Sequence, residues 1–121
     1  MTEVPIALHA KVSSAPVRVA LLRPPVVVAM GGLGACGPTP PVGLAYIAAA
    51  LVGAGHDVQV IDSPGEEMEN FEHLEVAIGT IRRIGLTPSQ MVDRIRTGTQ
   101  VVGVTHMFAH EWPTVRELVD L

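Results

Sequence analysis

The sequence predicts an α/β fold, a Rossmann-like parallel sheet with flanking helices. Three short apolar segments of strand type are separated by segments with helical periodicity, an order that implies right-handed crossovers between parallel strands. Hydrophobic residues make up 48% of the 121 residues but aromatic residues only 3%. The core is therefore expected to be aliphatic, as in a parallel sheet that is buried on both faces. A chain of this length forms one domain at most.

The first strand is predicted at residues 17–23, after a lead-in at residues 1–16 that shows no periodicity. The two prolines that follow end this strand, because proline cannot donate a hydrogen bond to a ladder. Residues 26–30 fit either an apolar loop or a strand of their own, and both assignments stay open. The domain itself is expected to occupy residues 17–121.

The central helix is predicted to follow a proline-rich loop. We expect the side-chain hydroxyl of Thr39 to cap the free backbone N–H groups of its first turn. A proline just inside the start of a helix is tolerated there, because it loses no hydrogen bond. The face opposite the large apolar residues is alanine rather than charge, so burial on several sides is expected. Gly53 and Gly55 are expected to end the helix. The apolar residues at helical spacing are Val42, Leu44, Ile47, Ala48 and Leu51.

The second strand is predicted at residues 57–62, where apolar and polar residues alternate before a Ser-Pro-Gly break. The acidic residues 66–75 are expected to form a solvated loop or a short helix, with a cation site as the alternative. No element is predicted over residues 74–86, because glycines interrupt the apolar positions there.

The last part of the chain is predicted to contain two helices around a third strand. Thr87 and Gln90 form a capping box with a proline at the first helical position, so a helix begins there, and Gly98 is expected to end it. The strand is predicted at residues 100–105, followed by a loop at residues 106–110 and a helix at residues 111–121. The expected apolar stripes are Met91, Val92 and Ile95 in the first helix and Trp112, Val115, Leu118 and Val119 in the second.

The composition excludes several classes of protein. The formal net charge is −4 and the only basic cluster is Arg82-Arg83, so no nucleic-acid partner is expected. The longest apolar run is too short to span a membrane and the N-terminus lacks the order of a signal peptide, so we expect no membrane partner and a cytoplasmic location. The single cysteine, Cys36, excludes an internal disulfide and a zinc or iron–sulfur site built from this chain's cysteines alone.

A glycine motif before the central helix suggests a competing function. Residues 32–37 fit G-x-G-x-x-G, and Asp62 ends the next strand, where a ribose-binding acid would lie in a dinucleotide site. That motif requires the helix to open on its glycines so that the helix N-terminus meets the pyrophosphate. The prolines at positions 38, 40 and 41 push the helix start beyond the last glycine, which argues against this interpretation.

Three further side chains have more than one interpretation. Cys36 lies among small apolar residues without a recognisable base nearby, so an inert thiol is favoured over a nucleophile. His106 and His110 flank the end of the third strand, where ligands bind in open α/β sheets. Spaced by four, they could bind a metal from one helical face, but lining a pocket is the favoured role.

Five segments, taken in their order along the chain, resemble the N-terminal cobalamin-binding domain of B12-dependent radical SAM enzymes. The resemblance covers residues 17–121, and its most specific part is the helix opening Pro-Pro-x-Gly-Leu-x-Tyr-x-Ala-x-x-Leu. The segments are LRPP at residues 22–25, PPVGLAYIAAAL at 40–51, GHDV at 55–58, ID at 61–62 and VVGVT at 101–105.

The resemblance implies that cobalamin lies across the carboxyl ends of the strands. Thr105 is similar to the hydroxyl residue that other cobalamin domains direct at the nucleotide tail, while Met107 and Phe108 would offer apolar surface to the corrin. It further implies a methyltransferase that acts on an unactivated carbon or phosphorus of a specialised metabolite. The positions that match the family's pocket are Thr39, Pro40, Pro41, Val42 and Gly43 before the helix and Thr105, His106, Met107 and Phe108 after the third strand.

The chain departs from the family in ways that limit this expectation. It lacks the D-x-H-x-x-G motif of a lower axial histidine and the C-x-x-x-C-x-x-C cluster motif. SAM and a 4Fe–4S cluster are therefore expected only in a downstream radical SAM domain, in cis or on a separate chain. Three strands are about half of a doubly wound sheet, so an incomplete domain that is not catalytic alone is expected. The alternatives are a non-enzymatic cobalamin carrier and a small dinucleotide-binding domain.

Overall fold

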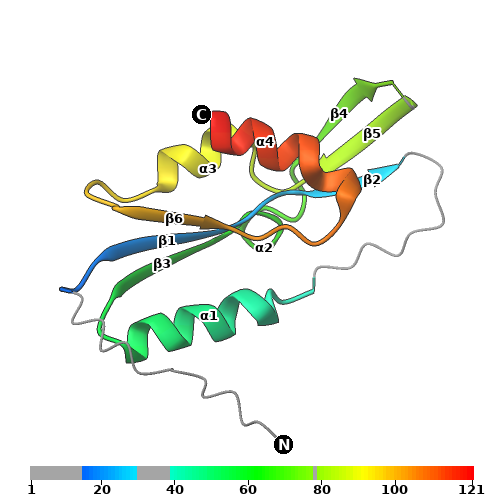
Figure 1. The fold of residues 1–121 in the computed structure, drawn as a ribbon. Helices are drawn as coiled ribbons and strands as arrows, with labels where there is room; N and C mark the ends of the chain where they lie inside the picture. Colours follow the sequence, from blue (N-terminus) through cyan, green and yellow to red (C-terminus); the bar gives the residue numbers. More distant parts are fainter. Residues whose placement is uncertain (1–14, 30–38, 78) are drawn as a thin grey trace, which may run out of the picture.

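The computed structural model describes residues 15–29, 39–77 and 79–121. The fold is α/β, with a Rossmann-like parallel sheet flanked by helices, as the sequence predicts (Figure 1). Strand β1 (Arg18–Arg23) lies in the middle of this sheet, between β3 (Asp57–Asp62) and β6 (Val101–Val104). Both neighbours run parallel to β1, and the three predicted strands agree with the structure to within one residue at each end.

The chain also forms a second sheet, which the sequence did not predict and whose strands alternate along the chain with those of the parallel sheet. It is antiparallel, in the order β2-β5-β4, with β2 (Val26–Ala29), β4 (Phe71–Val76) and β5 (Gly79–Ile84). The prolines after β1 therefore mark the passage from one sheet to the other, and residues 26–29 form a strand rather than a loop.

The expectation of a solvated loop or short helix over the acidic segment is wrong for its second half. Only α2 (Ser63–Glu66) is helical, and the segment then enters β4. Cross-strand partners on β5 explain the difference, because Glu72 lies opposite Arg83 and pairs with it at 2.8 Å. Opposite charges on facing strands stabilise a strand that composition alone marks as solvated.

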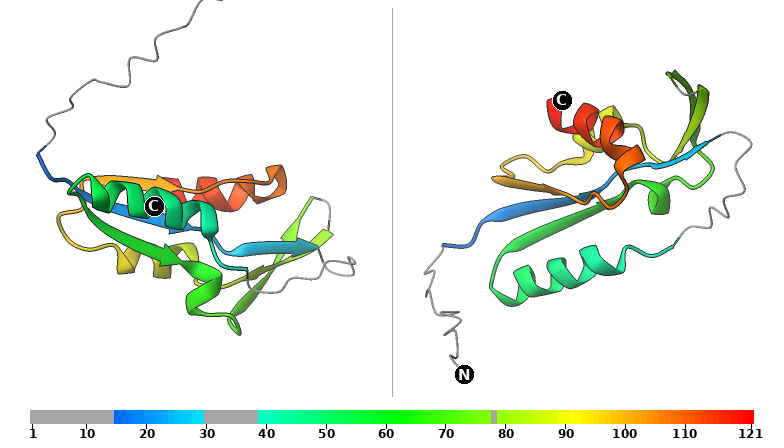
Figure 2. Two further views of the ribbon diagram at one scale, coloured as in Figure 1. Left: turned by 90° about the horizontal axis from the view of Figure 1, so that it is seen from below. Right: turned by 45° about the vertical axis from the view of Figure 1, so that its right-hand side comes forward.

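Helices cover both faces of the parallel sheet (Figure 2). Helix α1 (Val42–Gly53) lies on one face, and α3 (Pro88–Arg94) and α4 (Trp112–Asp120) lie on the other, with the short 3-10 turn η1 (Ala109–Glu111) before α4. Alternate residues of β1 point to opposite faces of the sheet, as in any strand, and so contribute to the two hydrophobic layers between the sheet and the helices. On the α1 side Val19 and Leu21 pack against Leu44. On the other side Ala20 and Leu22 join Ile61, Leu86, Met91 and Leu118.

The structure corrects both predicted ends of α1. The helix begins at Val42 with Pro41 at the N-cap position and without a side-chain cap, so Thr39 does not cap it. At the other end Gly53 is still helical, and the stop comes at Gly55, whose φ of 90° lies in the left-handed region that favours glycine. The predicted stop is therefore right for the second glycine alone.

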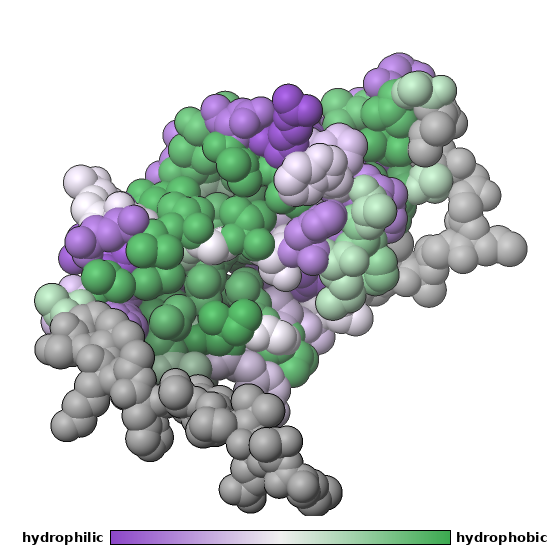
Figure 3. All heavy atoms as spheres, in the orientation of Figure 1, coloured by the Kyte–Doolittle hydropathy of each residue, from purple (hydrophilic) through white to green (hydrophobic). Residues whose placement is uncertain are grey.

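The predicted burial of α1 on several sides is wrong for this chain. Leu44 is the buried residue of the helix, whereas Tyr46 is 76% exposed and Val42 and Val52 are each 58% exposed. Figure 3 shows a broad hydrophobic area that extends from α1 onto the neighbouring strands. Despite its apolar composition, neither α1 nor any other helix of the described residues has the length and hydropathy of a membrane span.

A pair of substitutions tests this one-sided burial. Leu44→Ala is expected to lower the free energy of unfolding by about 2–5 kcal/mol, because it opens a cavity against β1. Tyr46→Ala lies two residues away on the exposed side and is expected to change it by at most about 0.5 kcal/mol. Urea unfolding followed by far-UV circular dichroism measures both. Equal losses for the two variants would contradict the exposed position of Tyr46.

The two later helices match their predictions in part. Thr87 accepts a hydrogen bond from the Gln90 backbone N–H, and Gln90 accepts one in return from the Thr87 N–H, so the capping box is confirmed. The helix ends at Arg94, earlier than predicted, and Gly98 lies in the turn before β6. In α4 Val115 and Leu118 are buried as expected, but Trp112 and Val119 of the predicted stripe are 52% and 65% exposed.

Candidate functional site

The candidate site lies at the carboxyl edge, by which we mean the ends of β1, β3 and β6 with the loops that follow them. Parallel strands that end together form the usual binding edge of an open α/β sheet. Two loops distant in sequence, residues 39–43 and residues 105–108, are attached to the last two residues of β1. The Thr105 backbone N–H donates to the Leu22 carbonyl at 3.0 Å, and the Arg23 guanidinium donates to the Thr39 carbonyl at 2.5 Å.

Arg23 and Asp62 form an ion pair at this edge that sequence reasoning did not assign to the site. Their side chains are 17% and 22% exposed, and the Arg23 Nη1 to Asp62 Oδ1 distance is 3.3 Å. The two residues are register partners at the ends of β1 and β3. The signal in the sequence was a charged residue at the end of each predicted strand, but only the pairing of the strands shows that they meet.

The first turns of α1 and the two prolines before it line an apolar cavity of about 300 Å³ that is open to solvent. Gly43 lies beside it in the first turn of the helix, has no positive φ, and would place a Cβ with no atom within 4 Å. Glycine weakens a helix relative to alanine, and the described chain gives no conformational or steric reason for it here. A glycine in open space suits the close approach of a ligand. The cavity is lined by Pro40, Pro41, Val42, Ala45, Tyr46 and Ala49.

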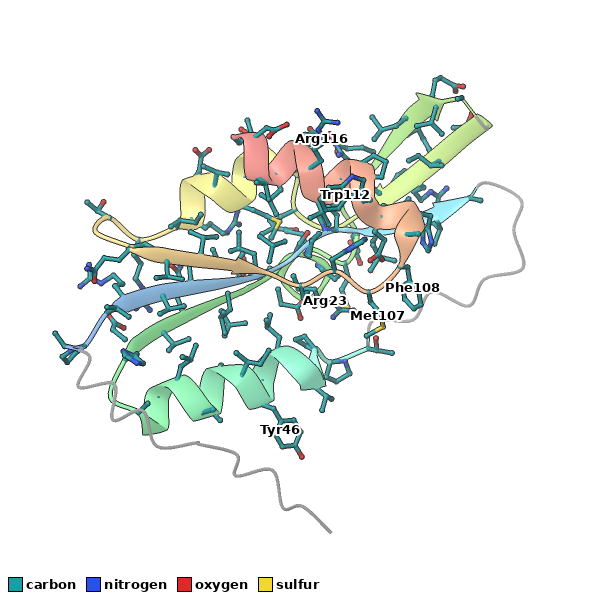
Figure 4. All side chains as sticks on the ribbon, in the orientation of Figure 1. Arg23, Tyr46, Met107, Phe108, Trp112 and Arg116 are labelled. Atoms are coloured by element: carbon teal, nitrogen blue, oxygen red, sulfur yellow. The ribbon has the colours of Figure 1, made fainter. Side chains whose placement is uncertain are left out.

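The loop after β6 presents two large apolar side chains at the carboxyl edge. Met107 is 78% exposed and Phe108 is 52% exposed, and Figure 4 shows them where the chain leaves β6, on the side of Arg23. The loop therefore offers apolar contact area beside the charged pair of Arg23 and Asp62.

The two histidines of this region are held by their neighbours. The His106 Nε2 lies 2.9 Å from the Phe108 carbonyl, and its ring lies 5.5 Å from the ring of Trp112. The His110 ring stacks on Phe108 at 5.7 Å. His110 belongs to η1 whereas His106 precedes it, so they do not share the helical face that the metal alternative requires. Within the described ranges, no group of three or more metal-ligating side chains occurs.

The glycine motif at residues 32–37 and Cys36 lie outside the described residues. The start of α1 at Val42 confirms that the prolines place the helix beyond the last glycine. Asp62, the acid that a dinucleotide site would use, is paired with Arg23. The described part of the edge thus combines apolar surface, one half-buried ion pair and an open glycine, a set that suits the binding of a large and mainly apolar ligand.

Comparison with known proteins adds one relative. Over 105 residues, 86% of this chain, the sequence is 30% identical to cytidylyl-2-hydroxyethylphosphonate methyltransferase from Streptomyces wedmorensis. The match covers 19% of that protein, so the chain spans about a fifth of the relative's length. No protein-family model and no solved structure matches the chain. The chain is thus similar to part of a methyltransferase.

Proposed function

We propose that this chain is the cobalamin-binding part of a B12-dependent radical SAM methyltransferase that acts on a specialised metabolite. Three observations support the proposal: the resemblance of the segments around residues 22–25 and 40–51, the Rossmann-like fold, and the sequence similarity to part of a methyltransferase. The chain binds the cofactor, and SAM and the 4Fe–4S cluster belong to a separate radical SAM domain.

The observation that carries this proposal is the meeting of two apolar loops at one sheet edge. Residues 39–43 and 105–108 are more than sixty positions apart, yet each is hydrogen-bonded to the end of β1. The residues present fit a large planar group, because Gly43 leaves open space and Met107 and Phe108 are exposed. A corrin has broad apolar faces, which soft and aromatic side chains contact well.

The proposal gives each loop its own task. Residues 39–43 allow close approach at Gly43, with Pro40 and Pro41 forming one wall of the cavity. The Thr105 hydroxyl is available to the nucleotide tail, while Met107 and Phe108 cover apolar surface and keep water from it. When bound, cobalamin supplies the cobalt centre that carries a methyl group from SAM to the substrate.

Titration of hydroxocobalamin into the purified chain, followed by its visible spectrum, tests the proposal. We expect a saturable spectral change that Gly43→Val weakens about tenfold or more, because the new side chain fills the space that the ligand needs. Gly53→Val is the matched control, since it also meets no atom within 4 Å but lies at the far end of α1. It is expected to leave the affinity unchanged.

Two results would contradict the proposal. One is the absence of any spectral change together with saturable binding of NAD, which would favour the dinucleotide alternative. The other is equal weakening by Gly43→Val and Gly53→Val, which would remove the ligand from the carboxyl edge. Binding of hydroxocobalamin by a protein that has no radical SAM domain, in cis or as a partner chain, would favour the carrier alternative.

A further inference from the structure

Strands β1 and β3 are joined by an arginine–aspartate pair at each end. At the amino end Arg18 lies opposite Asp57 with a distance of 3.0 Å, and at the carboxyl end Arg23 lies opposite Asp62 at 3.3 Å. The pairs differ in burial: the first has side chains 43% and 50% exposed, the second 17% and 22%. Solvent screens an exposed ion pair strongly, so the less exposed pair, Arg23 with Asp62, is better able to hold neighbouring groups in place.

Only the pair at the carboxyl end, Arg23 with Asp62, reaches the loop before α1. Arg23 Nη1 donates to the Thr39 carbonyl at 2.5 Å, and Nη2 lies 3.4 Å from the Thr39 hydroxyl. One guanidinium thus spans β1, the end of β3 and residue 39. The fork of donors on an arginine makes such a three-way contact possible, whereas the single ammonium of a lysine cannot reproduce it.

The loop has few other means of attachment. Pro40 and Pro41 lack backbone N–H groups, and no side chain caps the helix that follows them. The backbone hydrogen bonds of this segment run within the loop and into α1, from Val42 to the Pro40 carbonyl and from Ala45 to the Pro41 carbonyl. They shape the loop but do not join it to the sheet. Among the described residues, Arg23 supplies the hydrogen bonds between the sheet and residue 39, and the helix beyond the loop packs on the sheet through Leu44.

We propose that Arg23, oriented by Asp62, is the positioning residue of the candidate site: it holds residues 39–43 at the carboxyl edge. The identity of the ligand in this inference rests on the proposed function, but the attachment of the loop does not. Loss of the guanidinium frees residue 39 and the two prolines from the end of β1, so this loop no longer keeps one position relative to the loop after β6, while Leu44 keeps α1 packed on the sheet. Preorganisation of a site raises its affinity without adding contacts.

The test compares Arg23→Met with the control Arg18→Met, which cuts the equivalent pair at the other end of the same two strands. Hydrogen exchange is measured in each variant at the amides of Val42 and Ala45, which donate to the Pro40 and Pro41 carbonyls of the loop, together with hydroxocobalamin affinity. We expect Arg23→Met to speed exchange at these amides and weaken binding, each by about tenfold, since hydrogen bonds from a charged donor contribute on that order. Arg18→Met is expected to change neither.

Arg23→Lys provides a second variant that retains the charge beside Asp62. We expect faster exchange at Val42 and Ala45 to persist in it, because the contact with Thr39 requires the fork. Wild-type exchange in Arg23→Lys, or equal effects of the Arg18 and Arg23 variants, would overturn the inference. If the wild-type chain binds no hydroxocobalamin, the proposed function fails, and the exchange rates at residues 42 and 45 still decide the role of Arg23.

Discussion

Leu22→Ala is expected to lower the free energy of unfolding by about 2–5 kcal/mol, a large part of the total stability of a domain of this size. Leu22 is 1% exposed in the middle strand, and it packs in the layer between the parallel sheet and α3 and α4. Its side chain touches residues from several elements, so the cavity left by alanine cannot close by the movement of one of them. Urea unfolding followed by circular dichroism measures the loss.

Val60→Ala serves as the matched control for this prediction. Val60 lies on β3 of the same sheet but is 40% exposed. Its truncation removes less apolar area from the interior, so a loss below about 1 kcal/mol is expected. A similar loss for Leu22→Ala and Val60→Ala would mean that the layer under α3 and α4 is not the main core of this chain.

The second large effect is expected from the carboxylates that neutralise Arg83. The Arg83 side chain is 6% exposed and contacts Glu72 on β4 at 2.8 Å and Glu117 on α4 at 2.5 Å. The double variant Glu72→Gln with Glu117→Gln leaves a buried guanidinium without a counter-charge, which costs about 3–5 kcal/mol of stability. Thermal unfolding of the double variant and of the wild type measures this loss of stability.

Arg83→Met separates charge burial from loss of packing. It removes the buried charge and leaves carboxylates that are 37% and 51% exposed and can be hydrated, so a smaller loss than that of the double variant is expected. The reverse order of the two losses would contradict this account of the contact between α4 and the second sheet.

The contribution of Arg83 is expected to be independent of pH near neutrality. Burial lowers the pKa of Arg83, but its hydrogen bonds with Glu117 and Glu72 outweigh burial and raise the pKa above the ordinary value. A group with a raised pKa contributes fully below its unfolded pKa and loses that contribution only as pH rises through the folded pKa. For arginine that range lies far above neutral pH.

The parallel sheet could be predicted because its signals are local. Its strands are short segments that are either apolar or alternate between apolar and polar residues, and the capping box at Thr87 specifies a helix start through contacts three residues apart. The antiparallel sheet could not be predicted in the same way. The glutamates of β4 resemble solvated residues, and the partner that neutralises Glu72 is Arg83, on a strand whose apolar pattern is interrupted by glycines.

The error over α1 has a different origin. A helix without charged residues indicates burial on several sides, but the pattern does not say what covers each side. Within the described residues only the sheet does so, through Leu44 and its neighbours. The apolar outer face with Tyr46 and Val52 is therefore exposed here.

The candidate site was predictable as a pair of loops but not as a connected structure. The resemblance pointed to residues 39–43 and 105–108, and the topology places both at the carboxyl edge. The pair of Arg23 and Asp62 was missed because the sequence does not show that β1 and β3 are neighbours whose last residues lie opposite each other. The expected role of Thr39 as a helix cap was wrong for a related reason, since its carbonyl and hydroxyl face Arg23.

Hydrogen exchange of the chain with and without hydroxocobalamin tests the central claim most directly, because it locates the ligand as well as detecting it. The claim is that both loops of the carboxyl edge contact one ligand. We predict slower exchange in the bound state at Val42 and Gly43 and at residues 105–108, with no change at the amino end of the sheet around Arg18. Protection confined to the amino end, or to one loop alone, would contradict the claim.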